Sequence, residues 1–326
     1  MFAKDDRAGK PRPWYFYFGA LFFSLILTLL IIELIVGLLS WAVYERPDFA
    51  GMQIGVSGPD STLIICLGDS HTYGVGAPKG RDYPTTLELV LNERAGMQGF
   101  AVLNLGQPGH NSSDALLELE SFIEQSPVKP DLLVLCVGKN NMNSLRNASI
   151  LPEHVREMSL PERLDYMLAH SGAYRISKMT IQRFRELRAD RDPRVDDQNF
   201  NYGQFVPTRR EPFLYQWALQ DYRTAADRCA QLGTTLVMMN YWEPFGFVDR
   251  AMRLVADEND NVFFVNQNFP IAGMPAYANA LISHPDMHPN ERGYYRIAKR
   301  LAAILIEQGL VHLPDERGPA NADEPL

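Results

Sequence analysis

The apolar residues of this chain fall into one long run near the N-terminus and a series of short runs after it. The long run extends from Trp14 to Trp41 and exceeds the roughly 20 residues that a helix needs to cross the hydrocarbon core of a bilayer. Tryptophan and tyrosine residues stand at both ends of the run, where the two headgroup layers would lie. This pattern predicts a single membrane-spanning helix, an anchor over residues 14–44.

Basic residues are concentrated on one side of this anchor. Four of them precede it and one follows closely: Lys4, Arg7, Lys10, Arg12 and Arg46. This bias predicts a cytoplasmic segment 1–13 and a single-pass protein of the inner membrane, with its remaining residues periplasmic or otherwise extracytoplasmic. The alternative is a cleaved signal peptide, but the apolar run is too long for one and no A-x-A cleavage pattern follows it. We therefore expect a retained signal-anchor.

Glu33 interrupts the long apolar run. A carboxyl group in hydrocarbon is costly and usually faces a partner or is protonated. One interpretation is that Glu33 marks helix association. In so apolar a segment, however, we expect the carboxyl group to be tolerated without a specific partner.

The short apolar runs are typical of buried parallel strands, because they have no polar face. They cover residues 62–67, 100–105, 132–137, 234–239 and 262–265. Helical patterns lie between and after them, at residues 84–94, 111–125, 215–232, 248–257 and 290–308. The alternation predicts an α/β fold with an open, doubly wound parallel sheet of the flavodoxin-like type.

The spacing of these elements also predicts the domain organisation. A Gly-, Pro- and Ser-containing linker is expected at 45–61, a single α/β domain at 62–312 and a disordered tail at 313–326. The connection between the third and fourth strands is too long for a single crossover, which predicts a helical insertion over 143–210. Within it, residues 174–188 have apolar and basic sides, and we expect this stretch to dock on the core with its basic side in solvent. Contact with anionic lipid or an acidic glycan is the alternative.

Net charge and cysteine content narrow the functional classes. The formal net charge of −8 argues against a nucleic-acid partner, because such binding depends on clustered Lys and Arg. The three cysteines, Cys66, Cys136 and Cys229, lack metal-ligand or disulfide spacing. Cys66 and Cys136 lie in apolar runs, so we expect free, buried thiols on neighbouring strands one and three.

Residues with catalytic potential stand where the predicted strands end. Ser70 follows the first strand, Gly106 the second and Asn140 the third, and His288 directly precedes the last helix. The carboxyl ends of parallel strands converge on one crevice. A nucleophilic serine needs a base, and its tetrahedral intermediate needs hydrogen-bond donors. The set therefore predicts acyl transfer through serine, without a cofactor.

Four motifs in this order resemble the conserved blocks of the SGNH branch of the GDSL esterase and lipase family. They are GDSHTYG at 68–74, NLG at 104–106, GKNN at 138–141 and DMHP at 286–289. The resemblance extends from about residue 63 to 308 apart from the insertion. It implies an SGNH hydrolase fold and a carboxylic ester hydrolase with Ser70 as nucleophile and His288 as base. It also implies an oxyanion hole formed by the N–H groups of Ser70 and Gly106 and the side chain of Asn140.

Two positions depart from the family pattern. Asn141 stands where the family has aspartate, which leaves Asn140 in place. Asp286 precedes His288 by two residues, whereas the family's acid reaches the imidazole from the third position. A shortened turn at Pro285 would restore this contact, and we expect Asp286 to be the catalytic acid; otherwise a backbone carbonyl orients the ring. His284 is the alternative base, although His288 stands directly before the final helix. His71 and His110 flank the predicted crevice, and we expect them to be rim residues or substrate contacts and not catalytic groups.

Two other functions stay open at this point. His284, Asp286 and His288 have side chains that bind zinc or iron, which would suit a metal-dependent hydrolase. Pro285 and Pro289 forbid a helical presentation of such ligands, so we expect no metal. The other alternative is a catalytically inactive, membrane-tethered glycan-binding module. The favoured hypothesis is a serine esterase that hydrolyses or transfers an acyl or acetyl group, with an acylated small molecule, envelope glycan or lipid as substrate.

Overall fold

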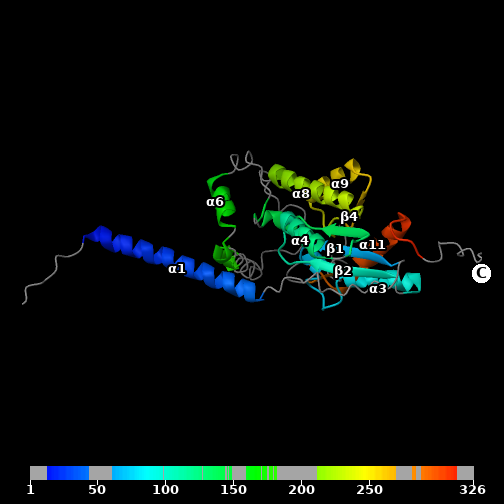
Figure 1. The fold of residues 1–326 in the computed structure, drawn as a ribbon, viewed down its shortest axis with the longest axis horizontal. Coiled ribbons are helices and arrows are strands. Elements are labelled where there is room, and N and C mark those ends of the chain that lie inside the picture. Colours follow the sequence, from blue (N-terminus) through cyan, green and yellow to red (C-terminus); the bar gives the residue numbers. More distant parts are fainter. Residues whose placement is uncertain are drawn as a thin grey trace, which may run out of the picture. The chain divides into compact units, whose positions relative to one another are not determined.

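Five parallel strands form the central sheet of the computed structural model (Figure 1). The sheet order is β2-β1-β3-β4-β5. The strands are β1 (Thr62–Gly68), β2 (Phe100–Gly106), β3 (Leu132–Cys136), β4 (Thr235–Met239) and β5 (Val262–Val265). All five predicted strands are therefore present, and the flavodoxin-like order is confirmed. The central strands β1 and β3 are buried along nearly their whole length, as a sheet covered on both faces requires.

The structure describes most of the chain. The described residues are 13–43, 61–143, 145, 147–148, 159–181, 211–268, 281–283 and 288–313, without Gln98, Pro127, His170, Arg175 and Met179. The predicted cytoplasmic segment, linker and tail lie almost wholly outside these residues, and so do His284 and Asp286.

Helices cover both faces of the sheet (Figure 1). On one face lie α4 (Ser112–Gln125), α8 (Glu211–Leu232) and α9 (Gly246–Glu258), and on the other lie α3 (Tyr83–Ala95) and α11 (Glu291–Glu307). The shorter elements are α2 (Ser70–Tyr73), the 3₁₀ helix η1 (Lys139–Met142), α6 (Leu160–Leu168) and the strand pair β6 (Ile282–Ser283) and β7 (His288–Pro289). This doubly wound arrangement places the ends of β1, β2 and β3 at one edge, as predicted.

Two glycines let the short helix α2 lie directly against the carboxyl ends of β1 and β2. A Cβ atom on Gly68 would stand 2.2 Å from both the carbonyl oxygen of Cys136 and Oγ1 of Thr72. A Cβ atom on Gly106 would stand 2.2 Å from the backbone nitrogen of Tyr73. Any side chain at either position would displace α2, whose first residue is Ser70.

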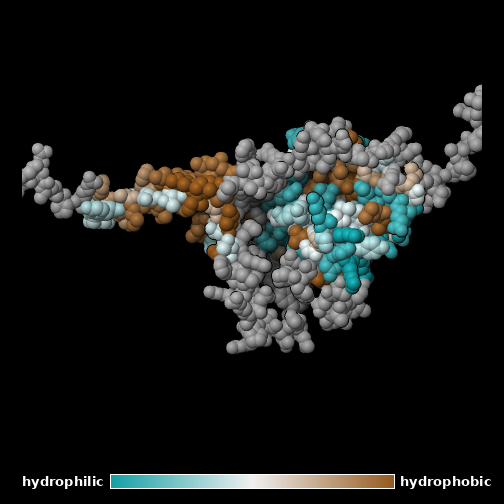
Figure 2. Space-filling model, turned by 90° about the horizontal axis from the view of Figure 1, so that it is seen from below, coloured by the Kyte–Doolittle hydropathy of each residue, from teal (hydrophilic) through white to brown (hydrophobic). Residues whose placement is uncertain are grey.

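The described chain divides into two units. Residues 13–43 and 167–181 belong to the first, and the sheet with its helices belongs to the second. The first contains α1 (Trp14–Val43), in which Trp14–Val36 is long and apolar enough to cross a membrane. The described side chains of this stretch are not buried, and much of the helix surface seen in Figure 2 is hydrophobic, with paler residues at its outer end.

Glu33 of α1 has hydrogen-bond partners in the first unit. Its carboxylate accepts bonds from Oγ of Ser171 at 2.8 Å and from the backbone nitrogens of Gly172 at 2.6 Å and Ala173 at 3.1 Å. The expectation that Glu33 is tolerated without a specific partner is therefore wrong. The described part of residues 174–188 belongs to the same unit as α1, so the expected docking of this stretch on the core stays a prediction.

The three cysteines are free thiols, and all are buried. Cys136 is the register partner of Gly68 on the adjacent strand β1, so it lies two positions along the pairing from Cys66, as the strand order predicted. Burial raises the pKa of Cys66 and, with the nearby Asp69 carboxylate, that of Cys136, and burial raises the pKa of Cys229 to about 12.

We expect the native thiols to resist modification because thiolate is the reactive form and a raised pKa keeps these groups protonated. At pH 8, the folded protein should show no thiol reactive toward Ellman's reagent, and guanidinium chloride should release all three. A Leu117→Cys variant places a thiol at an exposed position of α4 and is the positive control. A native thiol that reacts as fast as this control would contradict the burial described here.

Candidate active site

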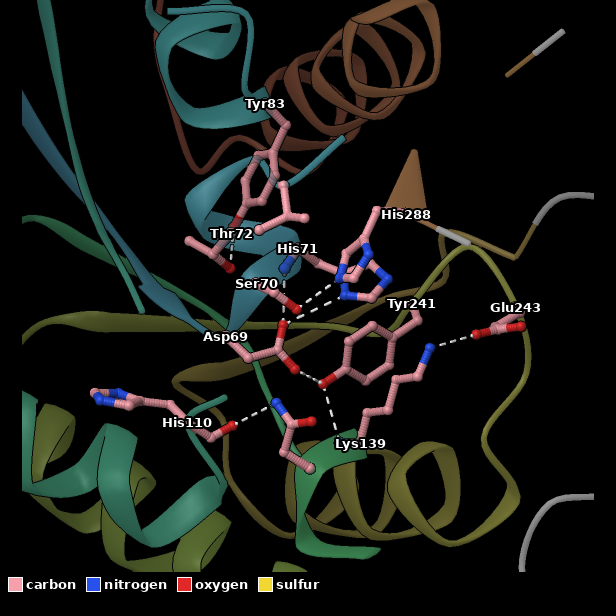
Figure 3. A network of polar contacts seen from close by, with 12 residues as sticks. Asp69, Ser70, His71, Thr72, Tyr83, His110, Lys139, Tyr241, Glu243 and His288 are labelled. Carbon is pink, nitrogen blue, oxygen red and sulfur yellow. Dashed lines mark hydrogen bonds and ion pairs between the residues drawn. The ribbon is translucent and has the colours of Figure 1, made fainter. Parts of the chain in front are cut away.

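Ser70 and His288 meet although 218 residues separate them in the chain. Nε2 of His288 lies 2.7 Å from Oγ of Ser70 (Figure 3). This distance is within the range in which a neutral imidazole accepts a proton from a hydroxyl group. The arrangement can therefore raise the nucleophilicity of the serine without a metal or an organic cofactor.

His288 is fixed by the structure around the start of α11. It pairs with Ser283 in the two-residue bridge of β6 and β7. Asn290 then caps α11, because its side chain accepts a bond from the backbone nitrogen of Gly293 and its own backbone nitrogen donates to the carbonyl of Leu281. The imidazole therefore projects from a short, hydrogen-bonded segment.

Asp69, directly before Ser70, organises the floor of the site. Its side chain is fully buried and caps α2 by accepting a bond from the backbone nitrogen of His71 at 2.9 Å. The hydroxyl of Tyr241 donates to the other carboxylate oxygen at 2.7 Å. Burial opposes ionisation of this group, but contacts with His71 and the bond from Tyr241 hold the pKa of Asp69 below its ordinary value.

Tyr241 connects Asp69 to the end of a third strand. Its hydroxyl accepts a bond from the backbone nitrogen of Lys139 at 3.0 Å while it donates to Asp69. The residues after β1, β3 and β4 are thereby joined through one buried phenol (Figure 3). Because Lys139 directly precedes Asn140, this chain of bonds also fixes the start of η1.

Of the predicted oxyanion groups, Asn140 lies at the beginning of η1 and Gly106 at the end of β2. Nδ2 of Asn140 donates to the carbonyl of His110 at 3.0 Å, and an amide nitrogen carries a second N–H. The backbone nitrogen of Gly106 donates to Oδ1 of Asn104 at 2.9 Å. An oxyanion bound by the Gly106 N–H would therefore share this donor with Oδ1 of Asn104 or displace Oδ1 from it.

Asn141, the departure from the family pattern, is buried in a polar network below η1. Its Oδ1 accepts a bond from the backbone nitrogen of Ser112, and its Nδ2 donates to Oγ of Ser112 at 2.7 Å. The hydroxyls of Ser112 and Ser113 in turn donate to the buried Asp221 of α8. The carboxylate of this network thus comes from α8, and residue 141 contributes the amide.

An ion pair lies beside the site, at the ends of β3 and β4. Nζ of Lys139 is 2.8 Å from Oε1 of Glu243 and 5.0 Å from the ring centroid of Phe245. Glu243 is nearly fully buried, whereas a quarter of the Lys139 side chain is exposed. The ammonium group is the more accessible member of this pair.

The structure brings Ser70, His288, Asn140 and Gly106 to the same edge of the sheet. His284 and Asp286 lie outside the described residues. His71 and His110 are buried, so their predicted position at the rim is wrong. The ring of His71 packs between those of His288 and Tyr241, with centroid distances of 4.7 and 4.8 Å.

Sequence reasoning missed Tyr241, Glu243 and Asp221. Tyr241 and Glu243 follow β4 closely. The rule that residues after parallel strands converge on one crevice, which pointed to Asn140 after β3, therefore applied to them as well. Asp221 lies in the middle of a helix, where an acidic residue is ordinarily taken as part of a solvated face. Only the packing of α4 on α8 reveals its role.

Comparisons with known proteins agree with this architecture. A family model described as the GDSL-like Lipase/Acylhydrolase family matches residues 66–296. No curated protein sequence matches the chain.

Three similar solved structures are all esterases. AlinE4, an SGNH-hydrolase family esterase, is 16% identical at a TM-score of 0.42, with 78% of this chain and 100% of that one covered. The psychrotrophic esterase EstA from Pseudoalteromonas sp. is 12% identical at 0.44, with coverage of 77% and 99%. A two-domain esterase active on acetylated mannans is 14% identical at 0.46, with coverage of 82% and 54%.

The polar network of Asn141 has its negative charge at Asp221 of α8, and a prediction follows from this placement. Asn141→Asp would place a second carboxylate against Ser112, whose hydroxyl proton already goes to Asp221. We expect the free energy of unfolding to fall by about 1–3 kcal/mol, which is a decrease of about 2–4 °C per kcal/mol in the thermal midpoint.

The control for this prediction is the double variant Asn141→Asp with Asp221→Asn. It reverses the direction of the bonds through Ser112 and keeps one carboxylate, so it should regain a large part of the lost stability. Thermal unfolding of the full chain in detergent measures both variants. A double variant that is as unstable as the sum of the two single variants would contradict the network.

Proposed function

The chain belongs to the GDSL-like lipase/acylhydrolase family, and on that premise we propose that Ser70 is the nucleophile of an acyl ester hydrolase and His288 is its general base. The observation that carries the proposal is the 2.7 Å distance between Nε2 of His288 and Oγ of Ser70. Neither a metal-dependent hydrolase nor an inactive binding module is favoured by the family.

In the proposed mechanism, Oγ of Ser70 attacks the ester carbonyl while His288 takes the hydroxyl proton. The tetrahedral intermediate then collapses, and His288 returns the proton to the departing alcohol. Water attacks the acyl-serine with the same assistance and releases the acid. Each of these proton transfers passes through Nε2 of His288. The acyl group therefore moves from the alcohol to Ser70 and then to water without any oxidation or reduction.

The oxyanion of both tetrahedral intermediates would be bound by the Ser70 and Gly106 N–H groups and the Asn140 amide. Ser70 is the first residue of α2, and the first N–H groups of a helix have no partner within it. Asn140 is held in place by the carbonyl of His110 and by the bond between Lys139 and Tyr241. The Ser70 and Asn140 donors are oriented before substrate binds, which lowers the reorganisation energy of the reaction, whereas the Gly106 N–H would have to share or leave its bond to Oδ1 of Asn104.

Asp286 completes the proposed site as the acceptor of a bond from Nδ1–H of His288. Such a bond fixes the tautomer that leaves Nε2 able to accept the proton of Ser70, and it stabilises the imidazolium formed during acylation.

The proposed location is the outer surface of the inner membrane. The apolar stretch Trp14–Val36 would retain the protein there, with the N-terminus cytoplasmic and the catalytic unit periplasmic. A tethered esterase at this place meets acyl and acetyl esters of envelope glycans and lipids, which we propose as the substrate class. Transfer of the acyl group to another hydroxyl would use the same acyl-serine.

We expect Ser70→Ala and His288→Ala each to lower kcat for p-nitrophenyl acetate by at least about 10³-fold. Asp286→Asn should lower kcat by at least roughly 10²-fold with little change in KM, because its bond strengthens mainly in the transition state. Ser121→Ala, at a partly exposed position of α4, is the matched control and should keep full activity. Activity that survives in Ser70→Ala and disappears with a chelator would instead identify a metal-dependent hydrolase. If Asp286→Asn keeps more than half of wild-type turnover, Asp286 leaves the catalytic set.

Topology is tested by reporter fusions. Alkaline phosphatase joined after Gly58 should be active in cells, because that point would lie outside the cytoplasm. A green fluorescent protein joined at the same point should remain dark if it is exported through the general secretion route. The reverse pair of results would place the catalytic unit in the cytoplasm.

A further inference from the structure

Glu33 is held by donors from a segment that lies far from it in the sequence. The bonds come from Ser171, Gly172 and Ala173, at the start of residues 172–181, which are helical at the described positions. The first N–H groups of a helix lack internal partners and carry its positive dipole end, so they suit a carboxylate. The anchor therefore caps a second helix.

Gly172 allows this close approach. A Cβ atom at this position would stand 2.6 Å from Cγ1 of Val36, which is shorter than any ordinary carbon contact. The backbone of the second helix thus touches α1 at Val36 while its N–H groups reach Glu33. A larger residue at 172 would separate the two helices.

The contact lies in the C-terminal half of the apolar run of α1. Glu33 precedes Trp41, the last residue of that run, by eight positions, or about 12 Å along a helix axis. In the proposed topology, this half lies in the outer leaflet. A helix over residues 172–181 would be about 15 Å long, so it reaches from this contact to the boundary between hydrocarbon and headgroups.

The side chains of this segment suit such a boundary. Ile176 and Ile181 are 52% and 54% exposed, and Met167, shortly before the segment, is 72% exposed. Tyr174 and Lys178 are half-buried, and both residue types combine an apolar body with a polar tip. The segment therefore carries apolar side chains that the described protein does not cover.

Its hydroxyl groups are bonded within the helix. Oγ of Ser177 donates to the carbonyl of Ala173 and Oγ1 of Thr180 to that of Ile176, both at 2.8 Å. Thr28 makes the same bond to Ser24 inside α1. Such bonds satisfy polar groups where no water is present.

We propose that residues 171–181 form a second membrane-associated element, an interfacial helix clamped to the anchor by Glu33, with lipid of the outer leaflet covering its exposed apolar side chains. The inference rests on the proposed membrane anchorage. Lipid is the occupant because these side chains stand on a helix that contacts α1 at Val36, and the apolar side chains of α1 are those that a bilayer would cover. The clamp also gives the Glu33 carboxylate the donors that it needs at this depth.

The test places an environment-sensitive NBD fluorophore on single cysteines of the full chain in phosphatidylcholine liposomes. The label is attached at Ile176→Cys, at Leu21→Cys in the anchor, or at Leu117→Cys in the catalytic unit, all exposed positions. The native thiols are buried, so labelled wild-type protein is the blank. Spin-labelled (doxyl) lipid and aqueous iodide are the two quenchers.

We expect the label at Ile176→Cys to lose fluorescence to doxyl lipid as strongly as that at Leu21→Cys, and to resist iodide. Quenching by iodide, as expected for Leu117→Cys, would overturn the inference. Protection from both quenchers would also overturn it, because a second protein surface would then cover the helix. If Leu21→Cys itself escapes doxyl lipid, the anchorage fails, whereas quenching at Leu21→Cys without quenching at Ile176→Cys removes only the interfacial helix.

A glycine pair tests the clamp. In the Ile176→Cys background, Gly172→Val should reduce quenching by doxyl lipid, because the added side chain pushes the helix away from Val36. Gly19→Val is the matched control, since a Cβ atom there meets nothing within 4 Å. Hydrolysis of p-nitrophenyl acetate verifies that each variant is folded. Unchanged quenching in a folded Gly172→Val variant would overturn the clamp.

Discussion

The hydrogen bonds of the buried Asp69 carboxylate are the interactions on which the candidate active site depends. A charge in a protein interior is stable only where hydrogen bonds replace its hydration. Here the backbone of His71 and the hydroxyl of Tyr241 provide those bonds, and the second of these groups also holds the backbone of Lys139. One ionised group therefore determines how the segments after β1, β3 and β4 lie relative to one another. Ser70 and Asn140, the candidate nucleophile and the candidate oxyanion amide, both adjoin residues of this network.

The elements of the sheet were predictable because their physical signal is local. A strand buried on both faces must be apolar at successive positions, and the five apolar runs correspond to the five observed strands within two residues. The meeting of Ser70 with His288 was predictable from the strand-end rule combined with the family motifs. The bond between Tyr241 and Asp69 requires the register of β4 relative to its neighbours, which no local pattern contains.

The errors have physical causes as well. His71 was expected at the rim because it flanks the predicted crevice, but its ring is buried, with Nδ1 3.4 Å from Oδ1 of Asp69 and the ring centroid 4.7 Å from that of His288. Glu33 has its partners some 138 to 140 residues later in the chain. The apolar context of its helix gave no sign of them. Asn141 is a third case. The family pattern has an aspartate at this position, whereas here Asp221 of α8 supplies the carboxylate of the network.

The grouping of residues 167–181 with the anchor has a mechanical consequence. The boundaries between the two units fall after residues 47, 166 and 195, so three covalent connections join them. A globular unit on one flexible tether explores a wide hemisphere, and each added connection removes orientations from that volume. Each connection acts separately, so a break in one of them leaves the two units covalently joined through the other two.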